Sequence, residues 1–147
     1  DGLFYAGRYK PRLVVDVATL TSSAVHAFGL RACPFFTGDF NLSRTLMELA
    51  EISGDLVWPM PLWDEYEDEI RGTFGDWANI GKSGGGRWGG VINAAVFLKQ
   101  FTLDYSASSA LLHIDMAPRM TAVDGEFLAK GAAGAPVRLL VSLLEKY

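Results

Sequence analysis

Two apolar runs, each interrupted by a single acid, stand out along the chain. Residues 14–21 read VVDVATLT, and residues 111–118 read LLHIDMAP. Residues 13–19 are apolar on both faces except for Asp16, which is typical of a strand covered on both sides. We therefore expect residues 13–19 to lie in the middle of a sheet, and we expect each run to end at a functional site.

Between these runs, helical patterns begin and end at residues that favour helix termini. Ser22 or Ser23 is expected to cap a short helix that reaches Phe28, with Gly29 as its stop. A longer helix begins near Asn41 or Ser43 and ends at Gly54. Its apolar face recurs at spacings of four, three and three residues and consists of Leu42, Leu46, Leu49 and Ile52.

The remaining segments continue the alternation of strands and helices. The expected elements are a strand at 32–37, an extended connector at 58–61, a charged helix at 64–71, a helix from Gly89 or Gly90 to Lys99, a strand at 110–116 and a last helix at 137–146. The two prolines of the connector lack the N–H that a helix interior or a central strand needs. This alternation is the pattern of an α/β domain.

Composition and charge narrow the class of protein. The chain has 147 residues, of which half are hydrophobic and 20% are charged, as is typical of a single folded domain. A formal net charge of −4 argues against binding to nucleic acid or an anionic membrane. Cys33 is the single cysteine, so no intrachain disulfide forms, and no signal segment or long apolar run is evident. We expect a cytoplasmic protein.

The glycine-rich segment 78–90, ANIGKSGGGRWGG, has three interpretations. Gly81-Lys82-Ser83 matches the end of a phosphate-binding loop, but position 76, where that motif needs glycine, is aspartate. The sequence around Ser83 also matches the G-x-S-x-G nucleophile motif, with Asp104 and His113 in the required order, but no buried strand precedes it. The favoured interpretation is a flexible loop that shapes the edge of a cleft, where Arg87 and Trp88 meet a ligand or another subunit.

Metal binding by this chain alone is not expected. His26 and His113 are far apart in sequence, and Cys33 has no cysteine or histidine at ligand spacing. His113 and Asp115 are two residues apart on one strand face, where they form either a pair behind a metal ligand or a buried hydrogen-bond network. Asp16, within an apolar strand, needs a partner because desolvating a lone carboxylate costs several kcal/mol.

Five segments together carry a resemblance to a known family. In chain order they are VVDVATLT at 14–21, VWPMPL at 57–62, ANIGKSGGGRWGG at 78–90, LLHIDMAP at 111–118 and KGAAGAPVR at 130–138. Their order and spacing resemble the C-terminal half of the leucine aminopeptidase family of hexameric two-metal exopeptidases. The resemblance covers nearly all of residues 1–147. It implies a mixed, mostly parallel sheet with helices on both faces, a three-layer α/β/α fold present here as a partial domain.

The resemblance also implies where the catalytic machinery lies. In the family the metal ligands are a lysine and two aspartates early in the catalytic domain, followed by the acids of an Asn-Thr-Asp-Ala-Glu-Gly-Arg motif whose arginine holds bicarbonate. This motif is absent from the chain, which resembles the family from a few residues after it. We therefore expect two divalent ions, zinc or manganese, bound upstream. This chain is expected to hold no metal ligand or catalytic residue and to be inactive alone.

What the resemblance places in this chain is the pocket for the substrate's N-terminal side chain. Thr19 and Leu20 match positions at a strand end, where the Leu20 carbonyl is expected to accept the substrate's amide hydrogen. Ala117 and Met120 match pocket-lining positions. Ser22 replaces a glycine of the pocket floor. Pro118 also replaces a glycine, and both changes bear on pocket depth and leucine preference.

The expected partners are a peptide substrate and either the N-terminal half of the enzyme or further copies in a homo-oligomer, a hexamer in the family. Two other functions stay open from the residues. One is a non-catalytic binding or scaffold module of the same fold, and the other is a serine hydrolase that uses Ser83. A truncated sheet has an exposed edge with unpaired donors and acceptors, and we expect a partner to cover it.

Overall fold

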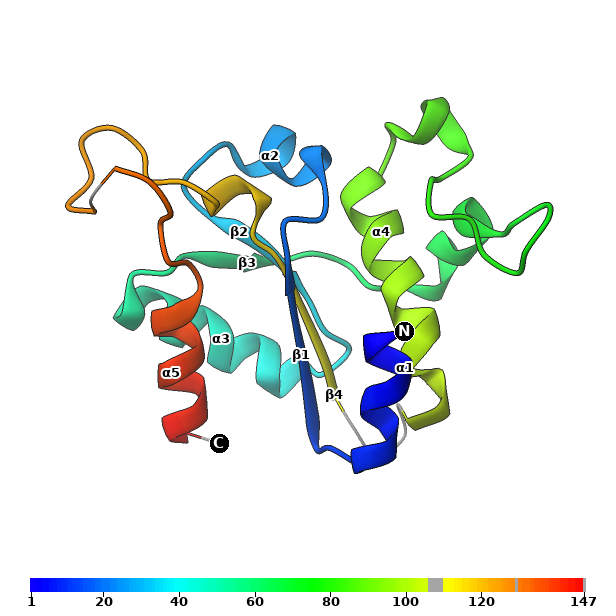
Figure 1. Ribbon diagram of the computed structural model, residues 1–147, viewed down its shortest axis with the longest axis horizontal. Helices are drawn as coiled ribbons and strands as arrows, with labels where there is room; N and C mark the ends of the chain where they lie inside the picture. Colours follow the sequence, from blue (N-terminus) through cyan, green and yellow to red (C-terminus); the bar gives the residue numbers. More distant parts are fainter. Residues whose placement is uncertain (106–109, 129, 147) are drawn as a thin grey trace.

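The computed structural model describes residues 1–105, 110–128 and 130–146, and it shows short helices around one sheet (Figure 1). The α-helices and strands are α1 (Gly2–Ala6), β1 (Leu13–Ala18), α2 (Ser22–Phe28), β2 (Cys33–Phe36), α3 (Phe40–Ser53), β3 (Val57–Pro59), α4 (Gly90–Lys99), β4 (Ala110–Asp115) and α5 (Val137–Lys146). Short 3-10 helices occupy Gly7–Tyr9, Asp64–Ile70, Ser83–Gly86, Gln100–Tyr105 and Ala117–Arg119.

Within the described residues, the sheet has four strands in the order β1-β4-β2-β3. β1 is parallel to β4, β3 is parallel to β2, and β4 and β2 are antiparallel, so the sheet is mixed and mostly parallel. This confirms the expected fold class. One expectation is wrong: β1 is not central but lies at the edge, where Val15 and Val17 are 38% and 36% exposed. The proline in β3 lies on the opposite edge strand, where its missing N–H is tolerated.

Helices cover both faces of the sheet and create two cores. On one face, α3 and α5 pack over Phe35, Leu112 and Ile114, all fully buried. On the other face, Phe36 packs with residues of α2 and α4. Figure 1 shows α3 and α5 on one side of β1 and β4, with α1 and α4 on the other. The central strands β2 and β4 thus alternate their side chains between two apolar layers, which is why they bury more fully than β1.

The caps of two helices differ from those expected. Asp39, rather than Asn41 or Ser43, begins α3, because one of its carboxylate oxygens accepts from the backbone N–H of Asn41 and of Leu42 at 2.8 and 3.0 Å. Likewise Thr21, rather than Ser22 or Ser23, begins α2. Its hydroxyl accepts from the N–H of Ala24 at 3.0 Å. The capping residue lies two or four positions before the expected ones in α3, and one or two positions before them in α2.

The ends of these helices follow the sequence more closely. Gly29 and Gly54 end α2 and α3 in positive-φ conformations that suit glycine. Leu42, Leu46 and Leu49 are buried on the inner face of α3, as predicted. Ile52 is not, since 79% of it is exposed. In the last turn of α3, the apolar residue Ile52 therefore faces away from the core.

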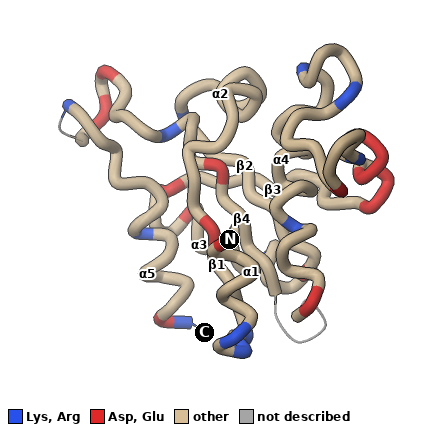
Figure 2. The backbone as a smooth tube through the Cα atoms, turned by 45° about the vertical axis from the view of Figure 1, so that its right-hand side comes forward, with Lys and Arg blue, Asp and Glu red and all other residues tan. Residues whose placement is uncertain are grey.

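The expected charged helix at 64–71 is a 3-10 helix, Asp64–Ile70, and its acids gather at one side of the molecule next to α4 (Figure 2). Lys99 of α4 forms ion pairs with Asp64 and Glu67. The pair with Asp64, whose side chain is exposed, contributes little, about 0–1 kcal/mol. The buried Ile70 joins the core and the partly buried Tyr66 packs against it, so apolar contacts also hold the segment in place.

Near the C-terminus, α5 is capped from a distant segment. The buried Asp55 accepts from the backbone N–H of Arg138 and of Leu139 at 2.9 and 3.2 Å, and it also pairs with the Arg138 guanidinium.

The single cysteine, Cys33, lies in the same core and is 1% exposed. Its burial raises the pKa of the thiol to about 12. No helix in the described ranges is long and apolar enough to cross a membrane.

The cap of α3 gives a direct test of the fold. We expect Asp39→Ala to lower the free energy of unfolding by about 1 kcal/mol, because two N–H groups lose their acceptor. Ser43→Ala, at the alternative cap position, is the matched control and should change it by less than about 0.5 kcal/mol. Urea unfolding followed by circular dichroism measures both. A larger loss for Ser43→Ala would contradict the assignment of Asp39 as the cap.

Candidate functional site at the strand ends and the glycine-rich loop

The carboxyl ends of β1 and β4 meet because the two strands are parallel neighbours. Asp115, the last residue of β4, is fully buried. Its Oδ1 accepts from the backbone N–H of Leu20 at 3.0 Å and of Ala117 at 3.2 Å. Its Oδ2 accepts from the backbone N–H of Thr21 at 3.1 Å and from the Thr21 hydroxyl at 2.7 Å. One carboxylate therefore ties the loop after β1 to the loop after β4.

The five residues assigned to the pocket by resemblance lie in these two loops. Thr19, Leu20 and Ser22 follow β1, whereas Ala117 and Met120 follow β4. Leu20 and Met120 are 40% and 51% exposed, and Ala117 is buried. The fold thus brings all five residues to the same end of the sheet. Their contact with a substrate stays a prediction.

His113 and Asp115 belong to separate networks and do not pair with each other. His113 Nδ1 lies 2.6 Å from Oδ2 of Asp16, its register partner on β1. The imidazole is stacked on Phe36, with ring centroids 5.7 Å apart, and among the described residues its Nε2 has no partner. Asp16 is therefore paired, as its place in an apolar strand requires. The expectation that His113 and Asp115 share one satisfied hydrogen-bond network is therefore wrong, because each residue belongs to a separate set of bonds.

The glycine-rich loop is held at its start by Glu69. The Ser83 hydroxyl donates to Glu69 Oε1 at 2.6 Å, and the Ser83 N–H donates to Oε2 at 2.9 Å. These two bonds, the hydroxyl first, lower the pKa of Glu69. Beyond Ser83 the chain turns through positive φ at Gly84, where the Trp88 ring leaves no room for a Cβ. The loop is thus anchored at one end and shaped by glycine thereafter.

This geometry does not assemble the two alternative chemistries. The Ser83 hydroxyl bonds to Glu69 and the His113 imidazole bonds to Asp16, so in the structure neither side chain is the other's partner. The segment just before Ser83 is not a strand, as a nucleophile elbow requires. A phosphate-binding loop would likewise follow a strand and lead directly into a helix. Here Arg87, Trp88 and Gly89 separate the 3-10 turn from α4.

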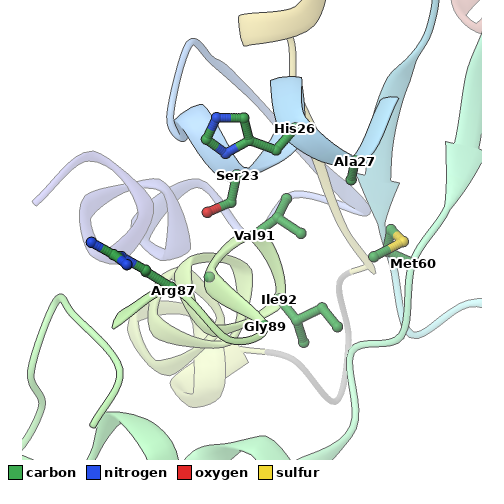
Figure 3. A pocket seen from close by; sticks show the side chains of 9 residues that line it. Ser23, His26, Ala27, Met60, Arg87, Gly89, Val91 and Ile92 are labelled. Carbon is green, nitrogen blue, oxygen red and sulfur yellow. The ribbon is translucent and has the colours of Figure 1, made fainter. Parts of the chain in front are cut away.

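The loop does form one side of a cleft, which lies between α2 and the start of α4 (Figure 3). We call it the α2–α4 cleft, and its volume is about 330 Å³. Its lining residues are Ser23, His26, Ala27, Met60, Arg87, Gly89, Gly90, Val91 and Ile92. None of the five residues assigned to the substrate pocket is among them.

Several anchoring carboxylates were not evident from the sequence. Glu126 accepts from both terminal nitrogens of Arg119 at 2.8 and 3.1 Å, which fastens the segment after β4. Glu69 and Asp55 do the same for the glycine-rich loop and for α5. Each partner is distant in sequence or lies in an irregular segment, so no local spacing marks it. Across the described ranges, no group of three or more His, Cys, Asp or Glu residues is placed to hold a metal ion.

A comparison of the sequence with models of protein families identifies the family of this chain. Residues 1–141 match the family model described as cytosol aminopeptidase family, catalytic domain. The chain belongs to this family. The resemblance drawn from the five segments is therefore confirmed.

Relatives agree with the cytosol aminopeptidase family model. A probable cytosol aminopeptidase of Azoarcus sp. (strain BH72) is 44% identical over 144 residues, which are 98% of this chain and 27% of the relative. One from Syntrophotalea carbinolica is 40% identical over 147 residues, 99% of this chain and 28% of the relative. A solved structure, a tomato leucine aminopeptidase mutant, K354E, superposes with a TM-score of 0.85 at 31% identity, covering all of this chain and 27% of that one. The chain thus spans just over a quarter of these cytosol aminopeptidase relatives.

The Asp115 network of this cytosol aminopeptidase family member can be tested by removing its acceptor. We expect Asp115→Ala to lower the free energy of unfolding by about 2–4 kcal/mol, because buried donors lose their partner. Amide hydrogen exchange should quicken at Leu20 and Thr21. The exposed Asp124→Ala is the control and should change neither quantity measurably. Unchanged exchange at both amides in Asp115→Ala would show that the carboxylate does not hold the loop.

The contact between Glu69 and Ser83 predicts a pH dependence. Because the pKa of Glu69 is lower in the folded chain than its ordinary 4.5, the contact stabilises the fold above that value. This contribution is lost as the pH falls through the folded-state pKa. Ser83→Ala should raise the pKa of Glu69 towards 4.5, as measured by carboxyl carbon NMR. An unchanged Glu69 titration in Ser83→Ala would refute the role of the hydroxyl.

Proposed function

We propose that this chain is the C-terminal part of the catalytic domain of a dinuclear metal-dependent aminopeptidase that releases N-terminal, leucine-like residues from peptides. The observation that carries the proposal is the joint anchoring by Asp115 of two loops at one end of the sheet. In α/β sheets, the carboxyl ends of parallel strands are where ligands bind. Membership of the cytosol aminopeptidase family supports the reaction class.

On this proposal, the chain's own residues bind the substrate and perform none of the chemistry. The Leu20 carbonyl accepts the substrate's amide hydrogen, since Asp115 holds the N–H of Thr21, which lies in the same peptide plane as that carbonyl. Ala117 and Met120 line the pocket for the N-terminal side chain, where the flexible thioether of methionine suits apolar groups of varied shape. Ser22 narrows the pocket floor relative to the glycine of the family.

We propose that the metal ions are bound outside this chain. Within the part of the chain that the structure describes, the residues do not offer the ligand set that a divalent ion needs. We therefore place two divalent ions, zinc or manganese, and a bicarbonate on the rest of the enzyme, and we assign no step of the reaction to residues here. The isolated chain is expected to be inactive.

The exposed edge of β1 is where we propose that a partner binds. Among the described residues, β1 has a neighbouring strand only on its β4 side, and Val15 and Val17 are partly exposed on it. An unpaired, apolar edge invites another strand. We propose that the remaining part of the enzyme or further copies of the chain cover this region in a cytoplasmic homo-oligomer, a hexamer as in the resembled family. Nucleic acid and membranes are not among the proposed partners, given the net charge of −4.

A chimaera tests the proposal. This chain would replace the matching 144 residues of the Azoarcus relative, and the product would be assayed on leucine p-nitroanilide with manganese or zinc. We expect activity that a chelator abolishes, and none from the 147-residue chain alone. In the chimaera, Met120→Ala should raise the KM for leucine p-nitroanilide several-fold more than the KM for alanine p-nitroanilide. Ile52→Ala, which shortens an exposed apolar residue of α3 outside both the pocket and the cleft, is the control and should leave both KM values unchanged.

The outcomes separate the alternatives. A folded chimaera without activity would favour the non-catalytic module of the same fold. Chelator-resistant hydrolysis by the chain alone, with Ser83 labelled by a fluorophosphonate probe, would favour the serine hydrolase. An equal effect of Met120→Ala on both substrates would remove Met120 from the pocket.

A further inference from the structure

The α2–α4 cleft carries polar groups that the fold itself does not use. Ser23 and His26 lie on α2, and Arg87 lies opposite them before α4 (Figure 3). Within the described ranges, none of these three side chains has a hydrogen-bond or ion-pair partner, whereas other arginines such as Arg119 and Arg138 are paired with carboxylates. No acidic residue lines the cleft. The Arg87 charge is therefore uncompensated at a concave surface.

The rest of the cleft is apolar and open. Ala27, Met60, Val91 and Ile92 supply its hydrophobic surface. Gly90 keeps its wall as bare backbone, because a Cβ there would come within 2.5 Å of the Ser23 hydroxyl oxygen. A small-molecule site typically combines an apolar lining with a few polar groups and a volume of about 300–1,000 Å³. The cleft, at about 330 Å³, has room for a ligand at the small end of this range.

We propose that the α2–α4 cleft binds a small carboxylate that carries an apolar side chain. The planar guanidinium of Arg87 presents paired N–H donors that match the two oxygens of a carboxylate. The Ser23 hydroxyl and the His26 ring add donors from the opposite side, and the apolar lining receives the side chain. Such a carboxylate is either the C-terminal end of a short peptide or a free amino acid.

This site is separate from the proposed substrate pocket. It shares none of the residues Thr19, Leu20, Ser22, Ala117 and Met120, and it needs no metal. The inference goes beyond the proposed function and does not rest on it. Because the binding test uses the chain alone without metal, its failure would leave the aminopeptidase proposal untouched, and the reverse also holds.

The test is a titration of the isotope-labelled 147-residue chain with N-acetyl-L-leucine, followed by NMR. We expect saturable shifts of the backbone amides of Gly89, Gly90 and Val91. N-acetyl-L-leucinamide, with the same apolar body and no charge, is the matched ligand and should bind at least tenfold more weakly. Equal affinity for the two ligands, or the absence of saturable shifts at these amides, would overturn the proposal.

Two arginine variants make the assignment specific to the cleft. Arg87→Gln should weaken binding of N-acetyl-L-leucine at least tenfold. It should still fold, because the side chain is exposed and unpaired among the described residues. Arg44→Gln removes an exposed arginine of α3 that lies outside the cleft, and it should leave the affinity unchanged. If both variants weakened binding equally, the loss would come from the lower positive charge of the chain in general, and the proposed site would be wrong.

Free L-leucine distinguishes the two sources of the carboxylate. Tighter binding of N-acetyl-L-leucine than of leucine would assign the cleft to a peptide C-terminus, since the blocked nitrogen resembles a peptide bond. Tighter or equal binding of leucine would assign it to a free amino acid. Both results support the site, because each still requires the carboxylate and Arg87.

Discussion

The buried carboxylate of Asp115 is the constraint on which the rest of this end of the molecule depends. A charge in the protein interior costs several kcal/mol unless hydrogen bonds replace its hydration. Here four donors do so, and three of them belong to Leu20 and Thr21 in the loop after β1. Since the same Thr21 hydroxyl accepts from Ala24 and begins α2, the position of α2 follows from the carboxylate as well. A shift of β4 by one residue would leave the Asp115 carboxylate buried without these donors. It would also release the loop after β1 and helix α2.

The two faces of the sheet are packed differently around the two proposed sites. On the face covered by α3 and α5, leucine side chains fill the core, and the distant ties are made by Asp55 and Arg138. On the other face, α2 and α4 meet at glycines and small residues, and a cleft remains between them. Rigid elements thus flank both the strand-end loops and the cleft. Glu69 adds an anchor where the glycine-rich loop has little side-chain packing of its own.

The sequence predicted those features that depend on local patterns. The apolar runs located β1 and β4, the leucine spacing located α3, and Gly29 and Gly54 marked helix ends. It failed for β1 because a strand apolar on both faces is equally compatible with a central place and with an edge that a partner covers. It also missed Asp39 as a cap, since several capping residues stand close together there. The bonds of Asp115 to Leu20 and Thr21 span more than 90 positions, and no spacing within one element encodes them.

The burial of Cys33 has a practical consequence for studying the chain. With a pKa of about 12, the thiol is almost entirely protonated near neutral pH, and the thiolate is the reactive form. Since Cys33 is the single cysteine and lies in the core between the sheet and α3, a thiol reagent reaches it only when that core opens. The rate at which Cys33 is alkylated therefore measures how often the core opens, and the measurement needs no introduced label.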